Sequence, residues 1–208
     1  MTLTRLFTHS GRGRTTRAAA LLLVVGATGV VSGCSKTVRE GQSPAYLVLR
    51  SLEGASGADT GEFSTVLRSD VVTNNSIFED NGRVTLTLAM RDIGVTTPTS
   101  NNLVTLNRYR VQYRRTDGRN TPGEDVPYSV EGAIGVTVTE QNTEAVFSLV
   151  RAQAKLEKPL VTLRGANGAL VISTIADVTF FGKDQTGRDV TVSGSISVNF
   201  ADWADKTN

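Results

Sequence analysis

The chain has 208 residues, and its 22 basic and 20 acidic side chains give a formal net charge of +2 at pH 7. Its single histidine, His9, and its single cysteine, Cys34, both lie near the N-terminus. The rest of the chain has no imidazole and no thiol, which excludes His-assisted nucleophiles and Cys/His zinc sites from it.

Residues 1–33 have the three zones of an export signal. Four arginines and no acidic residue form the first zone. They precede an uncharged stretch over residues 18–33, which contains the apolar run AAALLLVV and ends in small residues before Cys34. Without these four arginines, the remaining chain has 18 basic and 20 acidic residues and a net charge of −2. No basic domain remains to favour a nucleic acid as partner.

The sequence VSGC, which ends at Cys34, resembles the lipobox of bacterial lipoproteins. The resemblance implies cleavage between Gly33 and Cys34 and a diacylglyceryl thioether on the Cys34 sulfur. In such families a Ser after the Cys, here Ser35, goes with transfer to the outer membrane. Two alternatives are a membrane-spanning anchor, since the uncharged run over residues 18–35 has 18 residues, and an ordinary cleaved signal with an incidental Cys.

Lipidation at Cys34 implies a location in the cell envelope, with the protein held to a membrane and facing the periplasm or the surface. Each buried methylene contributes about 0.8 kcal/mol, and two acyl chains hold a protein stably where one does not. Residues 34–44 then form a lipidated tether that ends at Pro44. Residues 45–208 are long enough for one domain with its own core.

The body of the chain consists of short runs with apolar residues at alternating positions, which predict β-strands. The predicted strands cover residues 45–52, 63–73, 83–91, 103–116, 128–139, 144–151, 169–181 and 188–200. Gly-rich or turn-rich segments at 54–62, 117–123 and 182–187 separate them, the last as a hairpin connection. Asn81-Gly82 is also typical of a turn.

The clearest alternation runs over residues 103–116, where successive side chains face opposite sides of a strand. One face carries Tyr109, Val111 and Tyr113. The other face carries Arg108, Arg110, Gln112 and Arg114. Arg108, Arg110 and Arg114 are our candidate face for an anionic ligand such as lipid headgroups or polysaccharide. The alternative is a solvated sheet face with no ligand.

The segment after residue 144 fits two structures. Its apolar spacing and helix-forming residues allow a helix that Pro159 would end. We expect a strand to about Arg151 and then a short helical turn over residues 152–158.

Seven to eight strands with at most one short helix predict an all-β protein with a single antiparallel β-sandwich. The order of the runs resembles an immunoglobulin-like domain, although the cysteine pair of antibody domains and its Trp are absent. Trp203, beyond the last strand, is expected to cover an open end of the sandwich. Residues 178–203 are similar to the C-terminal part of small bacterial lipoproteins, from which no activity carries over.

Two loops place carboxylates close together in a way that suits Ca²⁺, which prefers hard oxygen ligands. The first loop contains Asp184, Gln185, Thr186, Gly187 and Asp189. The second loop contains Asp117, Asn120, Glu124 and Asp125. Neither matches a full calcium-loop pattern, and turns use the same residues for their backbone preferences. We therefore assign no metal, no cofactor and no catalytic residue.

These patterns predict an envelope lipoprotein that works by binding or assembly and not as an enzyme. Its expected partners are the membrane, through the lipid anchor, and a protein of the envelope. The alternative is a module that binds glycan or an anionic polymer. A hydrolase without histidine is a third hypothesis, and it requires buried carboxylates that converge in a cleft.

Overall fold

The computed structural model describes residues 41–59, 61–95 and 97–203. The chain divides into two compact units, Met1–Gly41 and Gln42–Asn208. The predicted signal, its cleavage site at Gly33 and Cys34, and the tether up to residue 40 lie outside the described residues.

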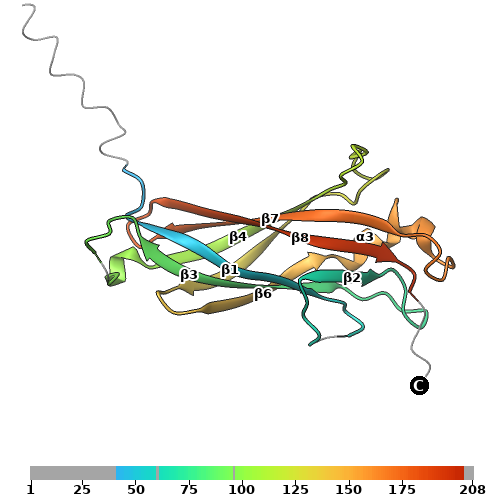
Figure 1. The fold of residues 1–208 in the computed structure, drawn as a ribbon, viewed down its shortest axis with the longest axis horizontal. Helices are drawn as coiled ribbons and strands as arrows, with labels where there is room; N and C mark the ends of the chain where they lie inside the picture. The colour runs from blue at the N-terminus through green and yellow to red at the C-terminus, as the bar shows by residue number, and fades with distance from the viewer. Residues whose placement is uncertain (1–40, 60, 96, 204–208) are drawn as a thin grey trace, which may run out of the picture. The chain divides into compact units, whose positions relative to one another are not determined.

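The described residues form eight β-strands (Figure 1). The strands are β1 (Ala45–Ala55), β2 (Val66–Asp70), β3 (Asp80–Met90), β4 (Val104–Arg114), β5 (Val130–Val138), β6 (Thr143–Val150), β7 (Ile172–Asp184) and β8 (Asp189–Ala201). Each predicted run overlaps one of them, and the prediction of an all-β protein is confirmed.

The strands form two sheets. The three-stranded sheet has the order β1-β3-β6, and the five-stranded sheet has the order β2-β8-β7-β4-β5. The prediction of a wholly antiparallel sandwich is wrong at one place, because β2 runs parallel to β8, from Val66 opposite Ser197 to Asp70 opposite Ala201. A tight hairpin forces antiparallel pairing between consecutive strands, but no hairpin joins these two, so their direction is free.

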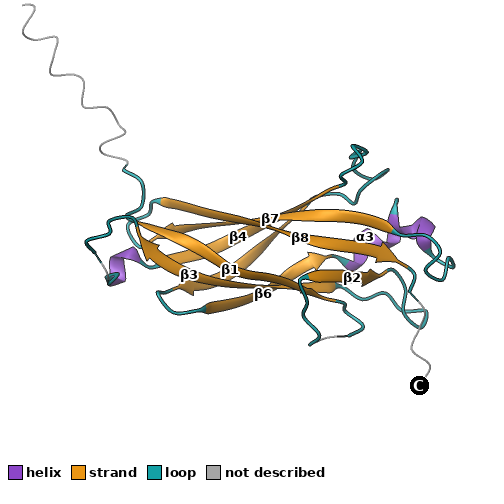
Figure 2. Ribbon diagram, in the orientation of Figure 1, coloured by secondary structure: helices purple, strands orange, loops and turns teal. Residues whose placement is uncertain are grey.

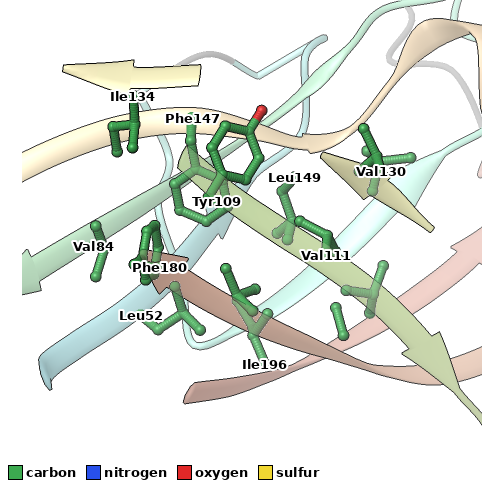
Figure 3. Close-up of a cluster of buried hydrophobic side chains, with 14 of the residues drawn as sticks. Leu52, Val84, Tyr109, Val111, Val130, Ile134, Phe147, Leu149, Phe180 and Ile196 are labelled. Atoms are coloured by element: carbon green, nitrogen blue, oxygen red, sulfur yellow. The ribbon is translucent and has the colours of Figure 1, made fainter. Parts of the chain in front are cut away.

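The core lies between the sheets and contains an aromatic cluster (Figure 3). Tyr109 and Phe180 come from the five-stranded sheet, and Phe147 comes from β6 in the other. The ring centroid of Phe147 lies 5.0 Å from that of Tyr109 and 5.2 Å from that of Phe180. The alternation predicted for β4 is confirmed, since Tyr109, Val111 and Tyr113 are buried and the alternating residues Arg108, Arg110, Gln112 and Arg114 are exposed.

The turn predicted at Asn81-Gly82 is wrong, because both residues lie inside β3. Gly82 is opposite Gly54 of β1 and Phe147 of β6. A Cβ atom at residue 82 would lie 2.4 Å from Cζ of Phe147. The glycine is therefore needed for the close approach of an aromatic ring, and not for a turn.

The helices are short and lie in the connections between strands (Figure 2). Helix α3 (Ala152–Leu156) follows β6, which agrees with the expected strand and helical turn. Two 3₁₀ helices, η2 (Ser100–Asn102) and η3 (Leu160–Leu163), were not predicted. No helix in the described part of the chain has the length and apolar character needed to cross a bilayer.

Trp203 lies directly after β8 and packs against β2. The guanidinium of Arg68 stands 4.2 Å from the centre of its ring, and its backbone N–H donates to Asp70 Oδ1 at 2.9 Å. The tryptophan therefore links the end of the last strand to the parallel edge strand.

Candidate functional site

The three candidate arginines lie on the solvent face of β4, where the alternation of the strand places them. Their side chains are about half exposed, at 48% for Arg108, 50% for Arg110 and 48% for Arg114. They stand on a central strand between β5 and β7, so residues of both neighbouring strands flank them.

Two carboxylates from these neighbouring strands pair with the arginines. Glu131 of β5 accepts from Arg108 Nη1 at 2.9 Å through one oxygen and lies 2.9 Å from Arg110 Nε through the other. Asp177 of β7 accepts from Arg114 Nε at 2.6 Å. The face therefore carries a network of ion pairs and is not an unpaired cationic patch.

The arginines change the acidity of their partners. The hydrogen bond from Arg108 is the main cause that lowers the pKa of Glu131 below its usual value. Burial acts to raise the pKa of Asp177, but hydrogen bonds from Arg114 and Ser195 outweigh it and lower that pKa. Both carboxylates stay ionised at neutral pH, so an anionic ligand has to compete with them for the arginines.

An open hollow of about 460 Å³ lies beside Arg108. It is lined by Asn107, Arg108, Phe181, Gly182, Lys183, Asp189 and Thr191. The register of β4 shifts between Leu106 and Arg108 against both of its neighbours. Asn107 is an extra, bulged residue relative to β7, whereas the extra residue of the pairing with β5 lies on β5, between Ala133 and Val136.

The lining combines a ring with polar side chains. The Arg108 guanidinium lies 4.0 Å from the centre of the Phe181 ring, and Lys183 Nζ donates to Asp189 Oδ1 at 2.6 Å. Asn107 and Thr191 add amide and hydroxyl groups. Such a set can hydrogen-bond a hydroxyl-rich or anionic group.

In the first loop considered for calcium, Asp184 Oδ1 accepts hydrogen bonds from the loop itself, and Asp189 Oδ1 accepts one from Lys183. Asp184 Oδ1 accepts from the Thr186 hydroxyl at 2.6 Å and from the backbone N–H groups of Thr186 and Arg188 at 2.9 and 3.0 Å. Burial acts to raise the pKa of Asp184, but these hydrogen bonds outweigh it and lower that pKa. Asp184 thus closes the turn of the β7–β8 hairpin.

The second loop is held in the same way by its own side chains. Asp117 pairs with Arg115 and Arg119, chiefly through the hydrogen bond from Arg115, which holds its pKa far below the usual value. The Asp125 carboxylate accepts from the Thr121 backbone at 3.1 Å. Within residues 41–203, as far as they are described, no three His, Cys, Asp or Glu side chains come together as a metal site.

A buried ion pair, which the sequence did not indicate, links the two sheets to helix α3. Lys155 Nζ of α3 donates to Asp80 Oδ1 of β3 at 2.8 Å, and the two side chains are only 1% and 0% exposed. The Ser69 hydroxyl of β2 donates to the other oxygen at 2.6 Å, and the Gly57 N–H donates to Oδ1 at 2.9 Å. One carboxylate thus joins β2, β3, α3 and the loop after β1.

This cluster contains the Ser and Lys types that some hydrolases use, but its geometry is structural. Burial raises the pKa of Asp80, and the charge and hydrogen bond of Lys155 act against the rise. Ser69 and Lys155 both donate to Asp80, and all three side chains are sealed from solvent. A substrate in solution cannot reach the Ser69 hydroxyl, so the cluster holds elements together.

Similarity to other proteins adds no functional assignment. No protein-family model, curated protein or solved structure matches the chain.

Proposed function

We propose that the chain is a lipoprotein of the bacterial cell envelope whose body acts as a binding or structural interaction module and not as an enzyme. The observation that carries the proposal is the sequence VSGC at Cys34, directly after a basic and then an uncharged stretch. The first strand begins at Ala45, 11 residues after Cys34, which leaves a short link between lipid and body.

We propose further that the body is an immunoglobulin-like sandwich. In that fold, strands A, B and E share one sheet, and strands G, F, C and C′ follow one another in the other. The orders β1-β3-β6 and β8-β7-β4-β5 correspond to these two sets, in the same sequence order. The parallel strand β2 extends the second set beside β8.

The ion pairs among the described residues support a structural role for the groups that form them. The arginines of β4 pair with Glu131 and Asp177, and Lys155 pairs with Asp80. A general acid or base has to be within reach of a substrate, with its protonation free to change. These groups instead stabilise the sheet surface and the interior.

The lipid anchor is tested by replacing Cys34 with Ser. We expect Cys34→Ser to abolish incorporation of labelled palmitate, because a hydroxyl is not alkylated in place of the thiol. The neighbouring variant Ser35→Ala keeps the thiol and is expected to keep the label. Globomycin should cause the precursor of the natural chain to accumulate. A mature protein with a free Cys34 thiol, or with residues 1–33 retained, contradicts the proposal.

The interaction role predicts a stable protein partner in the envelope. Crosslinking in intact membranes and purification of the mature chain should recover one defined protein beside it. Recovery of the chain alone as a monomer counts against this role.

A second candidate function, binding of glycan or an anionic polymer, is favoured by the hollow beside Arg108. Polar groups and a guanidinium stacked on a ring are combined there at an open surface. The Arg face extends this surface along β4.

Charge reversal tests this second function. The triple variant Arg108→Glu, Arg110→Glu, Arg114→Glu is expected to weaken retention on an anionic polysaccharide by about tenfold or more, because attraction becomes repulsion. The matched control reverses three exposed arginines elsewhere, Arg50, Arg68 and Arg119. Equal retention of the two variants and the natural chain removes the hypothesis.

A further inference from the structure

One apolar side chain is far more exposed than any other in the described residues. Ile93, in the loop that follows β3, is 98% exposed, whereas the next large hydrophobic side chain, Val146, is 58% exposed. Val95 in the same loop is 40% exposed. Single exposed apolar side chains are common on protein surfaces, so the position of Ile93, beside Val95 and in a loop that starts next to Pro44, is what distinguishes it.

The loop of Ile93 starts beside the point where the chain enters the folded body. The backbone N–H of Arg91 donates to the Pro44 carbonyl at 2.8 Å, and Arg91 Nε donates to the Ser43 carbonyl at 2.9 Å. The Arg91 guanidinium also lies 5.7 Å from the centre of the ring of Tyr46, which is 40% exposed. Apolar, aromatic and cationic groups therefore meet at the root of the tether.

The length of the tether limits how far this loop can be from the lipid. Ser43 follows Cys34 by nine residues. A fully extended chain of that length spans at most about 32 Å. If Cys34 carries the acyl chains at the bilayer surface, the loop next to Ser43 is always within that reach.

We infer that the 92–95 loop is a second membrane contact, with Ile93 and Val95 inserted among the lipids of the leaflet that holds the acylated Cys34. The inference rests on the proposed lipid anchor. Tyr46 and Arg91 suit the headgroup level, where aromatic rings and long cationic side chains combine apolar and polar contacts. Within the loop, Asp92 accepts from the Gly94 N–H at 2.8 Å, which turns the chain sharply at the tip.

The partner is a lipid surface, because the tether holds this end of the body at the bilayer. An additional apolar contact on a lipid-linked protein fixes a second point at the bilayer, which sets the orientation of the body. The loop contains one aspartate, Asp92, and follows one arginine, Arg91, so the contact depends on apolar insertion more than on charge. Zwitterionic vesicles should therefore be sufficient for it.

The test uses the full mature, lipidated chain in phosphatidylcholine vesicles, with Ile93→Cys carrying a nitroxide spin label. Cys34 is the only natural cysteine and its sulfur is alkylated in the anchored protein, so only residue 93 takes the label. We expect the label to lose collisions with an aqueous nickel complex and to keep collisions with oxygen, which dissolves in the bilayer.

The matched control is Leu170→Cys, at another exposed apolar residue. Leu170 lies before the start of β7, and the loop of Ile93 leads through η2 to Val104, which pairs with Asp184 at the opposite end of β7. A label at residue 170 is therefore expected to collide freely with nickel.

The outcomes separate this inference from the proposed anchor. Equal nickel access at residues 93 and 170 overturns the inference while the anchor stands, and so does protection at residue 93 that appears only when envelope proteins are added. A second spin label on Cys34, seen by mass spectrometry, means that the anchor itself is absent. Ile93→Ser, at a side chain with no packing to lose, should leave folding unchanged and increase the freedom of the body above the bilayer.

Discussion

Replacement of Lys155 with Ala is expected to lower the free energy of unfolding by about 3–5 kcal/mol. The substitution leaves the Asp80 carboxylate buried without its cation, and removal of one partner of a buried pair costs far more than removal of both. Urea unfolding, followed by circular dichroism, measures the change. The loss should also loosen α3, because Lys155 is the buried residue of that helix.

Two further variants make this prediction specific. The double variant Lys155→Met, Asp80→Asn removes both charges. The amide oxygen at residue 80 can still accept from the Gly57 N–H, and the amide NH₂ can donate to the Ser69 hydroxyl, so the variant should recover most of the lost stability. The exposed neighbour Lys158→Ala should change stability by no more than about 0.5 kcal/mol. A Lys155→Ala protein as stable as Lys158→Ala would show that the ion pair does not hold the elements together.

Replacement of Phe180 with Ala is expected to cost about 3–5 kcal/mol of stability. Phe180 is completely buried, and its ring meets that of Phe147 edge to face at 5.2 Å (Figure 3). The truncation removes an aromatic contact between the two sheets and leaves a cavity that rigid strands cannot close.

The adjacent residue provides the control for the Phe180 prediction. Phe181 is on the opposite, solvent-facing side of β7, under the Arg108 guanidinium. Phe181→Ala should cost less than about 1.5 kcal/mol, since it loses a surface contact and not core volume. Equal losses for the two variants, measured in the same urea titration, would contradict the placement of the core.

The strands were predictable because their signal is local. In β4, Tyr109 and Val111 alternate with Arg108 and Arg110, and the sheet buries one set and exposes the other. The helical turn after β6 was predictable for a related reason, since helix-forming residues are followed closely by Pro159. Each of these patterns is complete within a dozen residues.

The wrong predictions concern contacts between distant residues. Gly82 follows Asn81 as it would in a turn, but the ring that requires the glycine belongs to Phe147. The parallel direction of β2 depends on β8, near the other end of the described chain. The sequence near Gly82 does not indicate Phe147, and the sequence of β2 does not indicate β8.

The charged groups show the same limit. Arg114 and Asp177 are 63 residues apart in sequence, and Lys155 and Asp80 are 75 apart. The sequence therefore indicated an arginine face but not the carboxylates that occupy it. Lys155 had the character of an ordinary helix former, and only the packing of α3 shows that its charge is buried.

The pairing of β2 with β8 has a consequence for the order of events during synthesis. β2 is made early, yet its partner is the last strand, so the five-stranded sheet stays incomplete until nearly the whole chain is available. Contacts between remote segments slow folding. If the chain is exported as we propose, this delay keeps the polypeptide unfolded while it crosses the membrane.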